Sequence, residues 1–533
     1  MTTDSLHSLS TPASHSDLCL DVPTTGDQVP TLPSINPIDR SMIDEVELTS
    51  PHRAETIVRR ARDAHRAWQR RPLETRIQRV HKYLDHLLEN RDHLLERLCQ
   101  ETGKSDLEAR RELWHTLEDV GHQLQHAHDV LCAQAHGGRP LGLRPRTARR
   151  PRGIVLVAPG AYAPLYTTIA PSVATLLSGN AVVIVGHRNA PLTPERCADL
   201  AHQAGFADDL WQSVCGGRRL VDALADRSDA VVSYRDAMHT RRLARRQGER
   251  MIPVMGRWPT GDILLVLADA DLPAAAQAAT RAACAGAGRR LRSLRRTYVQ
   301  RAVHDAFVDH VVEAVGALRA AQPTSSEAPP LPGVGPLPDR DALNAIQDLV
   351  DDATDAGARL VAGGHPHHDH QGFFYHPTVL TQVDESMRLW REHAPGPILA
   401  IAPTQAPIDA IQQSRQAPRA GALSIFTRQP DVAHQLAELA PTPAVGINHI
   451  PHFLPPQTPP GPATADACPD PLGAHRLRAL TQQSLVVERR PASLPSWLSE
   501  QPPKRRRQAL DAALSIQAKK RRLGRRLNDL WPL

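Results

Sequence analysis

A strand, a helix and a second strand follow one another within residues 153–185, and this succession constrains the fold more than any other feature of the chain. Residues 153–159 form a short apolar run that ends in proline, which is typical of a strand buried on both faces. A helix is predicted over 164–177, closed by Gly179, before a second apolar strand at 181–185. Strand, helix and strand in so short a stretch predict a βαβ unit and hence a parallel sheet.

Similar segments extend this pattern along the chain. Apolar residues recur at three- and four-residue spacing from Ala54 to Trp68, which predicts a helix with one buried face. Further strands, with helices between them, are predicted at 229–233, 263–267, 297–300, 397–402 and 422–427. The expected fold class is therefore α/β, with largely parallel sheets in two lobes.

The net charge of +6 is concentrated near the C-terminal end. From Lys504 to Leu533, ten Lys and Arg residues stand against two Asp residues, so the rest of the chain is close to neutral. Basic runs of this kind are typical of segments that bind nucleic acid or another anionic surface. We expect either a solvated, disordered tail or an anionic partner, nucleic acid or an acidic protein, bound through residues 504–526.

Cysteine usage and hydropathy exclude several classes of protein. The seven cysteines are scattered without a C-x-x-C pair, which argues against a disulfide framework or a zinc ribbon. No apolar run reaches the roughly 18 residues of a membrane span. The N-terminal residues lack the basic and apolar regions of a secretory signal. We therefore expect a cytoplasmic protein without a membrane span.

Short motifs in a fixed order resemble the aldehyde dehydrogenase superfamily over about residues 35–490. They are Asn36-Pro37, Glu101-Thr102-Gly103-Lys104, Pro164 with Gly179-Asn180, Ala268–Leu272, Gly372–Leu380, Gly396-Pro397 and Gly446–Asn448. The resemblance implies two lobes with Rossmann-type parallel sheets and a small bridging element that mediates a homodimer or homotetramer. The boundaries expected on this basis are 1–34 (disordered segment), 35–133 with 151–258 (cofactor-binding lobe), 134–150 with 472–490 (bridging element), 259–471 (catalytic lobe) and 491–533 (basic tail).

The nucleophile segment of that superfamily is similar to residues 286–299, and its cysteine position holds Leu291. A leucine side chain has no lone pair to attack a carbonyl carbon, so it is not a covalent nucleophile. The position of the oxyanion-stabilising asparagine holds Tyr162, and no carboxylate stands near Met255, where the resemblance places the general base. Cys284 is the one local thiol and hence the candidate nucleophile. The alternative is that it is a buried helix cysteine without a catalytic role.

Four positions that the resemblance associates with NAD or NADP are also changed. Val185 stands at the position of a ribose-binding lysine, and His393 at that of a glutamate that holds the nicotinamide ribose. Arg235 and Asp236 replace the glycine and serine at the helix start beside the pyrophosphate. A side chain at this glycine obstructs close approach to a phosphate, and Asp236 adds negative charge there. We expect NAD or NADP to be the cofactor if any binding is retained.

Two clusters of polar side chains have no counterpart in these motifs. The first is basic and is expected to be a solvated loop, with a patch for an anion or an acidic partner as the alternative; it comprises Arg289, Arg290, Arg292, Arg295 and Arg296. The second resembles a metal-binding tract, but we expect a solvated surface loop and assign no metal site; it comprises His365, His367, His368, Asp369 and His370.

Two hypotheses of function follow from the sequence. The first is a catalytically inactive member of the superfamily, a pseudoenzyme with a structural, regulatory or binding role. The alternative is an NAD(P)-dependent oxidoreductase that acts on an aldehyde in an atypical active site. The nucleophile position separates the two hypotheses, because thiol chemistry demands a cysteine near Leu291 and Cys284 is the nearest.

Overall fold

The computed structural model describes residues 30–135, 143–257, 260–290, 292–318, 333–368, 370–392, 396–416, 421–440, 442, 444–451, 455–458, 471–489 and 515. They fall into two compact bodies. The first contains the described residues up to Leu131 and from Pro151 to Gln482, and the second those of Cys132–Arg150 and from Gln483 onward. The basic tail at 504–526, apart from Ser515, lies outside the described residues.

The first sheet of the large body is entirely parallel, and its described strands lie in the order β7-β6-β5-β8-β9. They are β5 (Ile154–Ala158), β6 (Ala181–Gly186), β7 (Trp211–Cys215), β8 (Ala230–Ser233) and β9 (Val254–Gly256). Helix α6 (Pro164–Leu177) connects β5 to β6, which confirms the βαβ unit predicted from the sequence.

The end of α6 shows why a glycine stands at position 179. Gly179 has a φ of +83°, in the left-handed region that glycine tolerates best. Its N–H donates to the carbonyl of Leu176 at 2.9 Å, and the N–H of Asn180 donates to that of Thr175 at 3.0 Å. This pair of hydrogen bonds is a Schellman motif, and it turns the chain directly into β6.

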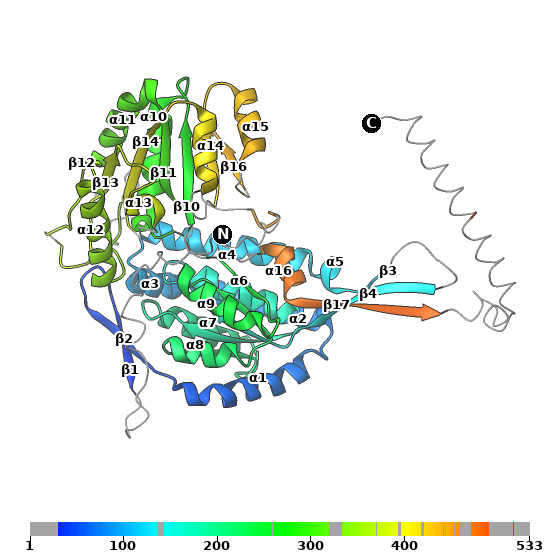
Figure 1. The fold of residues 1–533 in the computed structure, drawn as a ribbon. Coiled ribbons are helices and arrows are strands. Elements are labelled where there is room, and N and C mark those ends of the chain that lie inside the picture. Colours follow the sequence, from blue (N-terminus) through cyan, green and yellow to red (C-terminus); the bar gives the residue numbers. More distant parts are fainter. Residues whose placement is uncertain are drawn as a thin grey trace, which may run out of the picture. The chain divides into compact units, whose positions relative to one another are not determined.

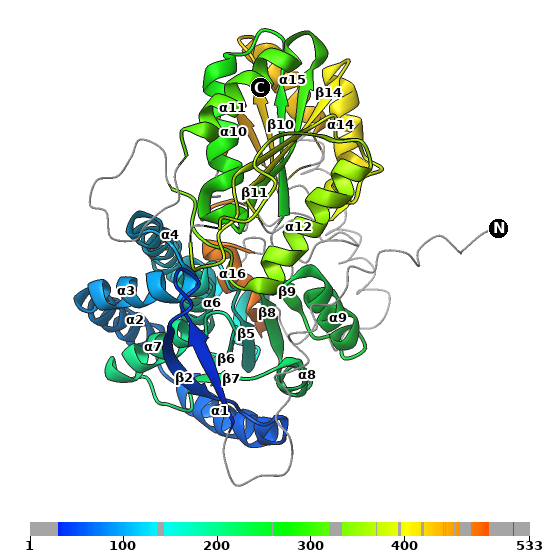
Figure 2. The same cartoon turned by 90° about the vertical axis from the view of Figure 1, so that its left-hand side faces the viewer.

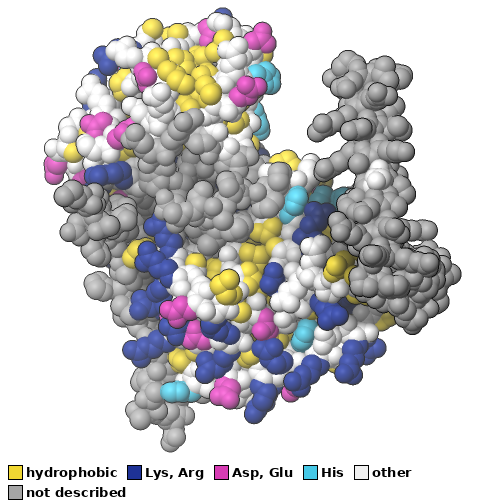
Figure 3. Space-filling view, turned by 45° about the vertical axis from the view of Figure 1, so that its right-hand side comes forward, with side chains coloured by type: hydrophobic (Ala, Val, Ile, Leu, Met, Phe, Trp, Pro, Cys, Tyr) yellow, Lys and Arg dark blue, Asp and Glu magenta, His cyan; other side chains and the backbone are white. Residues whose placement is uncertain are grey.

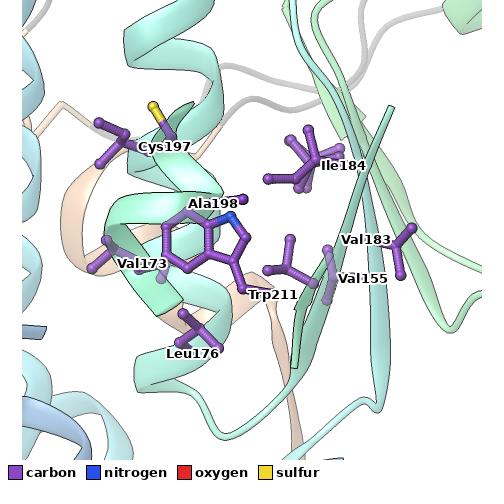
Figure 4. Packing of buried hydrophobic residues seen from close by; sticks show 14 of the residues in the cluster. Val155, Val173, Leu176, Val183, Ile184, Cys197, Ala198 and Trp211 are labelled. Atoms are coloured by element: carbon purple, nitrogen blue, oxygen red, sulfur yellow. The ribbon is translucent and has the colours of Figure 1, made fainter. Parts of the chain in front are cut away.

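Helices pack on both faces of this sheet (Figure 1). They are α1 (Ala54–Trp68), α2 (Leu73–Glu89), α3 (Arg91–Thr102), α4 (Asp106–Gln125), α5 (Ala127–Leu131), α7 (Leu192–Gln203), α8 (Arg218–Ala225) and α9 (Ala237–Gly248). The indole of Trp211 is 0% exposed and lies among Val173 and Leu176 of α6 and Ala198 of α7 (Figure 4). The bounds of α1 confirm the helix predicted from Ala54 to Trp68.

A second sheet forms the other lobe of the large body (Figure 2). Its described strands lie in the order β12-β13-β14-β11-β10-β15-β16, all parallel except β12. They are β10 (Thr260–Val266), β11 (Arg292–Gln300), β12 (Arg359–Ala362), β13 (Thr378–Thr381), β14 (Ile398–Thr404), β15 (Leu423–Phe426) and β16 (Val445–Ile447). The accompanying helices are α10 (Leu272–Cys284), α11 (His304–Gly316), α12 (Arg340–Asp355), α13 (Arg388–Arg391), α14 (Pro407–Gln416) and α15 (Pro430–Leu439).

Two motifs of the sequence serve as helix caps. The carboxylate of Glu101 accepts hydrogen bonds from the N–H groups of Leu192 and Thr193, at 2.6 and 3.0 Å, and so caps α7. Asp271 caps α10 by accepting from the N–H of Ala274 at 3.1 Å. These residues therefore stabilise the fold in the described structure.

Three smaller elements complete the described chain. A hairpin of β1 (Thr31–Ile35) and β2 (Met42–Glu47) begins inside the segment predicted to be disordered, whose first 29 residues lie outside the described ones. Helix α16 (Gly473–Ala479) packs in the large body, where Arg476 pairs with Asp119 at 2.9 Å. The small body holds a sheet in the order β17-β4-β3, made of β3 (Gln134–Ala135), β4 (Leu143–Pro151) and β17 (Thr481–Arg489). The predicted domain boundaries stay predictions.

Among the described residues, none of the helices has both the length and the apolar character needed to cross a bilayer.

Asp339 joins the two lobes of the large body. Its Oδ1 accepts from the N–H of Ala342 at 2.8 Å and so caps α12. Its Oδ2 accepts from Arg188 at 2.7 Å and from the side chain of Asn189 at 2.9 Å, and both residues follow β6 in the other lobe. Burial alone raises the pKa of this carboxyl, but the hydrogen bonds from Ala342 and Arg188 outweigh burial and leave the pKa lowered.

We expect Asp339→Ala to lower the free energy of unfolding by roughly 2–4 kcal/mol, because a cap and hydrogen bonds to a charged group are lost. The matched control is Asp341→Ala, whose side chain is 61% exposed and 3.7 Å from Arg188; its effect should be within about 0.5 kcal/mol. Denaturant unfolding measures both.

Since the folded pKa of Asp339 is lowered, the stabilisation that this carboxylate contributes is present above its unfolded pKa. That stabilisation is lost as the pH falls through the folded pKa. Equal losses of stability in Asp339→Ala and Asp341→Ala would contradict the role of Asp339 in joining the two lobes.

Candidate functional site

A cavity of about 720 Å³ lies between the two lobes of the large body. Its walls come from α4, from the start of α6, from α10, and from residues on either side of position 291. The carboxyl ends of β9 and β15 also reach it through Arg257 and Phe426. Because ligands in α/β proteins bind at the carboxyl ends of parallel strands, this cavity is the candidate functional site.

Tyr162, at the predicted oxyanion position, lines this cavity. The ammonium group of Lys104 lies 4.0 Å from the centroid of its ring, and the guanidinium of Arg289 lies 5.4 Å from it. Burial raises the pKa of the Tyr162 hydroxyl. Gly286, with a φ of +62°, packs against the ring where a Cβ would collide with it. The tyrosine is therefore held by two nearby cations and by the close backbone of Gly286.

The predicted nucleophile and base positions are only partly described. Leu291 and His393 lie outside the described residues. Met255 is buried in β9, and Arg257, two residues further on, lines the cavity in its place. Sequence reasoning singled out Met255 and missed Arg257, because a shift of two residues at a strand end leaves the motif equally well matched.

Cys284 ends α10 and is 3% exposed, so it is a buried cysteine of a helix. Burial raises the pKa of its thiol to about 12, although the nearby charge of Arg295 acts in the opposite direction. It is not among the described residues that line the cavity. A thiol that stays protonated at neutral pH and lies outside the cavity is a poor nucleophile for a ligand bound there.

The expectation that the basic cluster is a solvated loop is wrong. Four of its arginines are buried, and Arg292, Arg295 and Arg296 belong to β11, a central strand of the second sheet. Arg295 donates to the carbonyl of Gly396 at 2.9 Å and Arg296 to that of Trp390 at 2.8 Å. Arg289 donates to that of Thr102 at 2.6 Å. These three arginines are buried because backbone carbonyls of neighbouring segments accept their hydrogen bonds, whereas Arg292 donates to the carboxylate of Asp262 at 3.2 Å.

Basic side chains predominate on part of the surface and also in the cavity. On the face in Figure 3, the described Lys and Arg side chains outnumber Asp and Glu over the lower part of the molecule. The cavity is lined by six basic side chains and two carboxylates, besides His115.

Three of the four predicted cofactor positions lie together at the carboxyl edge of the first sheet. The guanidinium of Arg235 donates to the carbonyls of Val185 and Gly186, at 2.9 and 2.8 Å. Asp236 caps α9 by accepting from the N–H of His239 at 2.8 Å. An internal carboxylate thus occupies the helix N-terminus where the resemblance places a pyrophosphate. In this arrangement the residues do not fit the dinucleotide in the family's manner.

The histidine-rich segment forms ring stacks. His367 stacks on His376 with ring centroids 3.6 Å apart, and His370 lies against Phe374 at 4.8 Å. Asp369 lies outside the described residues. Within the described part of the chain there is no group of three or more side chains arranged to hold a metal ion.

Comparison with known proteins identifies the family. The sequence model of the aldehyde dehydrogenase family matches residues 24–465, so the chain belongs to that family. It is 31% identical over 362 residues to a protein of Mycolicibacterium smegmatis whose assignment as a succinate-semialdehyde dehydrogenase, NADP(+), is itself provisional, with 67% of this chain and 68% of the relative covered. It is 28% identical over 417 residues to the 4,4'-diapolycopene aldehyde oxidase of a Methylomonas species, with 76% of each chain covered.

Solved structures agree on the fold. The lactaldehyde dehydrogenase of Escherichia coli aligns with a TM-score of 0.81 at 21% identity, covering 87% of this chain and 97% of that one. An aldehyde dehydrogenase of Mycobacterium tuberculosis complexed with NAD+ aligns with a TM-score of 0.81 at 23% identity, covering 89% and 96%. These likenesses confirm the α/β, aldehyde-dehydrogenase-like fold with parallel sheets that the sequence predicts.

We expect iodoacetamide to alkylate Cys284 in the folded protein more slowly than Cys132 by roughly a hundredfold or more, because the Cys284 thiol is buried and protonated whereas Cys132 is exposed. Mass spectrometry of peptides from quenched time points measures both rates. The denatured chain is the control, in which the two thiols should react alike. Comparable rates in the folded protein would show that Cys284 is accessible and would restore it as a candidate nucleophile.

Proposed function

We propose that this chain is an oxidoreductase of the aldehyde dehydrogenase family that acts on an aldehyde in an atypical active site. The observation that carries the proposal is the family match over residues 24–465. Relatives named as enzymes of aldehydes support it. NAD or NADP is the cofactor that the family would supply, and its nicotinamide would accept or donate the hydride. The misfit at Arg235 and Asp236 means that we assign no residue of this chain to dinucleotide binding.

The site is atypical because the chain's own residues offer no thiol to the cavity within the described part of the structure. What they offer is positive charge and the hydroxyl of Tyr162. Guanidinium groups and a phenol can polarise a carbonyl oxygen or hold an oxyanion, whereas they cannot form a thiohemiacetal. The chemistry proposed here is therefore non-covalent activation of the carbonyl group.

A second candidate function is ligand binding without turnover, the pseudoenzyme of the sequence analysis. Two observations favour it. The nearest thiol, Cys284, is buried with a pKa of about 12, and the N-terminus of α9 is capped by Asp236. Both observations concern steps that aldehyde oxidation in this family requires. The two candidate functions therefore differ in one measurable property, which is turnover of an aldehyde.

Incubation of the full chain with NAD or NADP and a panel of aldehydes tests the proposal through the absorbance of the reduced nicotinamide. We expect turnover, and we expect Cys284→Ala to retain it within about twofold, because this thiol does not line the cavity. A complete lack of turnover with every aldehyde would reject the oxidoreductase and favour the binding protein. Turnover that Cys284→Ala abolishes would instead contradict the non-covalent site.

We also propose that the chain forms a homodimer or homotetramer, in the cytoplasm. The support is β17, an edge strand of the small body on which Leu485, Val486 and Val487 are 65%, 45% and 48% exposed. An exposed apolar edge strand pairs readily with another chain. A partner of the basic tail at 504–526 stays a prediction, since that tail is outside the described residues apart from Ser515.

Replacing both Leu485 and Val487 by Asp is expected to convert the assembly to a monomer, because two charges would be desolvated in the interface. Light scattering coupled to size-exclusion chromatography measures the mass. The matched control is Met251→Asp, an 89% exposed apolar residue of the large body, which should leave the mass unchanged. A wild-type monomer, or an oligomer that survives the double replacement, would contradict the role of β17.

A further inference from the structure

We propose that the α1–α8 surface, made of the exposed residues of 51–71 and 218–227, binds the phosphate backbone of double-stranded DNA without recognising its sequence. This inference goes beyond the proposed function and does not depend on it. The α1–α8 surface shares no residue with the described lining of the cavity. DNA binding and turnover of an aldehyde can therefore be tested, and can fail, separately.

Positive charge is concentrated in the part of the chain that forms this surface. Residues 51–71 and 218–250, which contain α1, α8 and α9, hold sixteen arginines and seven carboxylates, a net charge of +9. The whole chain has a net charge of +6, although residues 504–533 add ten Lys and Arg against two Asp. The remaining residues are therefore acidic on balance, so the positive charge of the body is gathered in these two segments.

The two helices form one continuous surface. Helix α8 packs against α1 and against the short helix Pro51–Arg53 that precedes α1. Both helices lie in the lower part of the large body (Figure 1 and Figure 2). Arg62 of α1 donates to the carboxylate of Asp229, which follows α8, at 3.1 Å. Helix packing and an ion pair thus hold the arginines of α1 beside those of α8.

The carboxylates of α8 leave this surface positive, because they are already neutralised by α9. Asp222 pairs with Arg242, and Asp226 pairs with Arg246. Six further arginines of the α1–α8 surface are exposed and form no ion pair within the described part of the chain; they are Arg53, Arg59, Arg60, Arg70, Arg71 and Arg218. Their charges face solvent and favour an anionic partner.

The arginines of α1 are spaced along the helix as a backbone of phosphates requires. Arg59, Arg62 and Arg66 share one face of α1, opposite the face that buries Ile57 and Ala61. Arg59 and Arg66 are about 10 Å apart along the helix axis. Over that length a DNA duplex presents roughly six phosphate charges. Since guanidinium groups donate paired hydrogen bonds to phosphate oxygens, the stripe contacts several phosphates of a duplex at once.

The absence of exposed apolar groups argues against other anionic partners. Protein interfaces have an apolar centre, and helices that bind membrane surfaces insert apolar side chains. Single-stranded nucleic acid stacks its bases on exposed aromatic rings. Among the described residues of 51–71 and 218–227, no large apolar side chain is exposed. The surface offers positive charge alone, which favours a duplex bound through its backbone.

Fluorescence anisotropy of the full chain with a labelled DNA duplex of about 20 base pairs tests this inference. We expect the combined variant Arg59→Gln, Arg60→Gln and Arg70→Gln to bind the duplex about tenfold or more weakly than the wild type. The slope of log affinity against log salt concentration should fall by roughly two to three, because each lost phosphate contact removes about one unit. The double variant Arg71→Gln and Arg218→Gln, on the same surface, should weaken binding by about threefold or more and gives an independent second measurement.

The matched control is the combined variant Arg301→Gln, Arg359→Gln and Arg428→Gln, which removes the same charge from exposed positions of the other lobe. Its affinity for the duplex should stay within about twofold of the wild type, since the basic tail is present in every protein compared. Equal losses of affinity in the surface and control variants, or no loss in either, would overturn the α1–α8 surface.

Competing anions test the choice of partner. A single strand of the same length, polyglutamate and vesicles that contain phosphatidylserine should each bind at least tenfold more weakly than the duplex. A single strand that binds as tightly as the duplex would overturn the choice of double-stranded DNA. Polyglutamate or vesicles that bind as tightly, with the same loss in the surface variant, would assign the surface to an acidic protein or to a membrane instead.

Discussion

The burial of guanidinium groups along β11 is the constraint on which the rest of the site depends. A buried charge is tolerated only where hydrogen-bond acceptors or opposite charges surround it, and an isolated one would cost several kcal/mol. Arg289, Arg295 and Arg296 meet this requirement by holding the carbonyls of Thr102, Gly396 and Trp390. Arg295 and Arg296 thereby hold two segments of the chain against β11, and Arg289, three residues before this strand, holds the end of α3.

Much of the fold follows from the sequence, and the reason is that short apolar strands and glycine caps are local signals. The unit from Ile154 to Gly186 was predictable because each element ends at a residue whose backbone behaviour is specific, as Gly179 shows. The burial of the arginines of β11 was not predictable, because a run of charged residues is normally exposed to solvent. Nothing in the local sequence reveals that carbonyls distant in the chain accept hydrogen bonds from these arginines. Strands β4 and β17 were missed for a related reason, since their sequences lack the apolar alternation of a buried strand.

The residues of the candidate site likewise divide into those that the sequence identified and those that required the structure. Tyr162 was found from the sequence because it stands at a fixed distance from Pro164, whereas Arg257 was missed because the spacing between β9 and β10 leaves the alignment loose. The clustering of Val185, Arg235 and Asp236 at one sheet edge follows from the topology, since parallel strands end at the same edge. The hydrogen bond from Arg235 to the carbonyl of Val185 and the cap that Asp236 forms on α9 depend on side-chain geometry and required the structure.

The fold of an aldehyde dehydrogenase and a cavity with no described thiol in its lining are therefore combined in one chain, and the account stands on whether such a site turns over an aldehyde. The most direct measurement is the assay of the full chain with NAD or NADP and a panel of aldehydes, read as the absorbance of the reduced nicotinamide. The account predicts turnover that Cys284→Ala retains within about twofold. No turnover with any aldehyde, or turnover that Cys284→Ala abolishes, would contradict it.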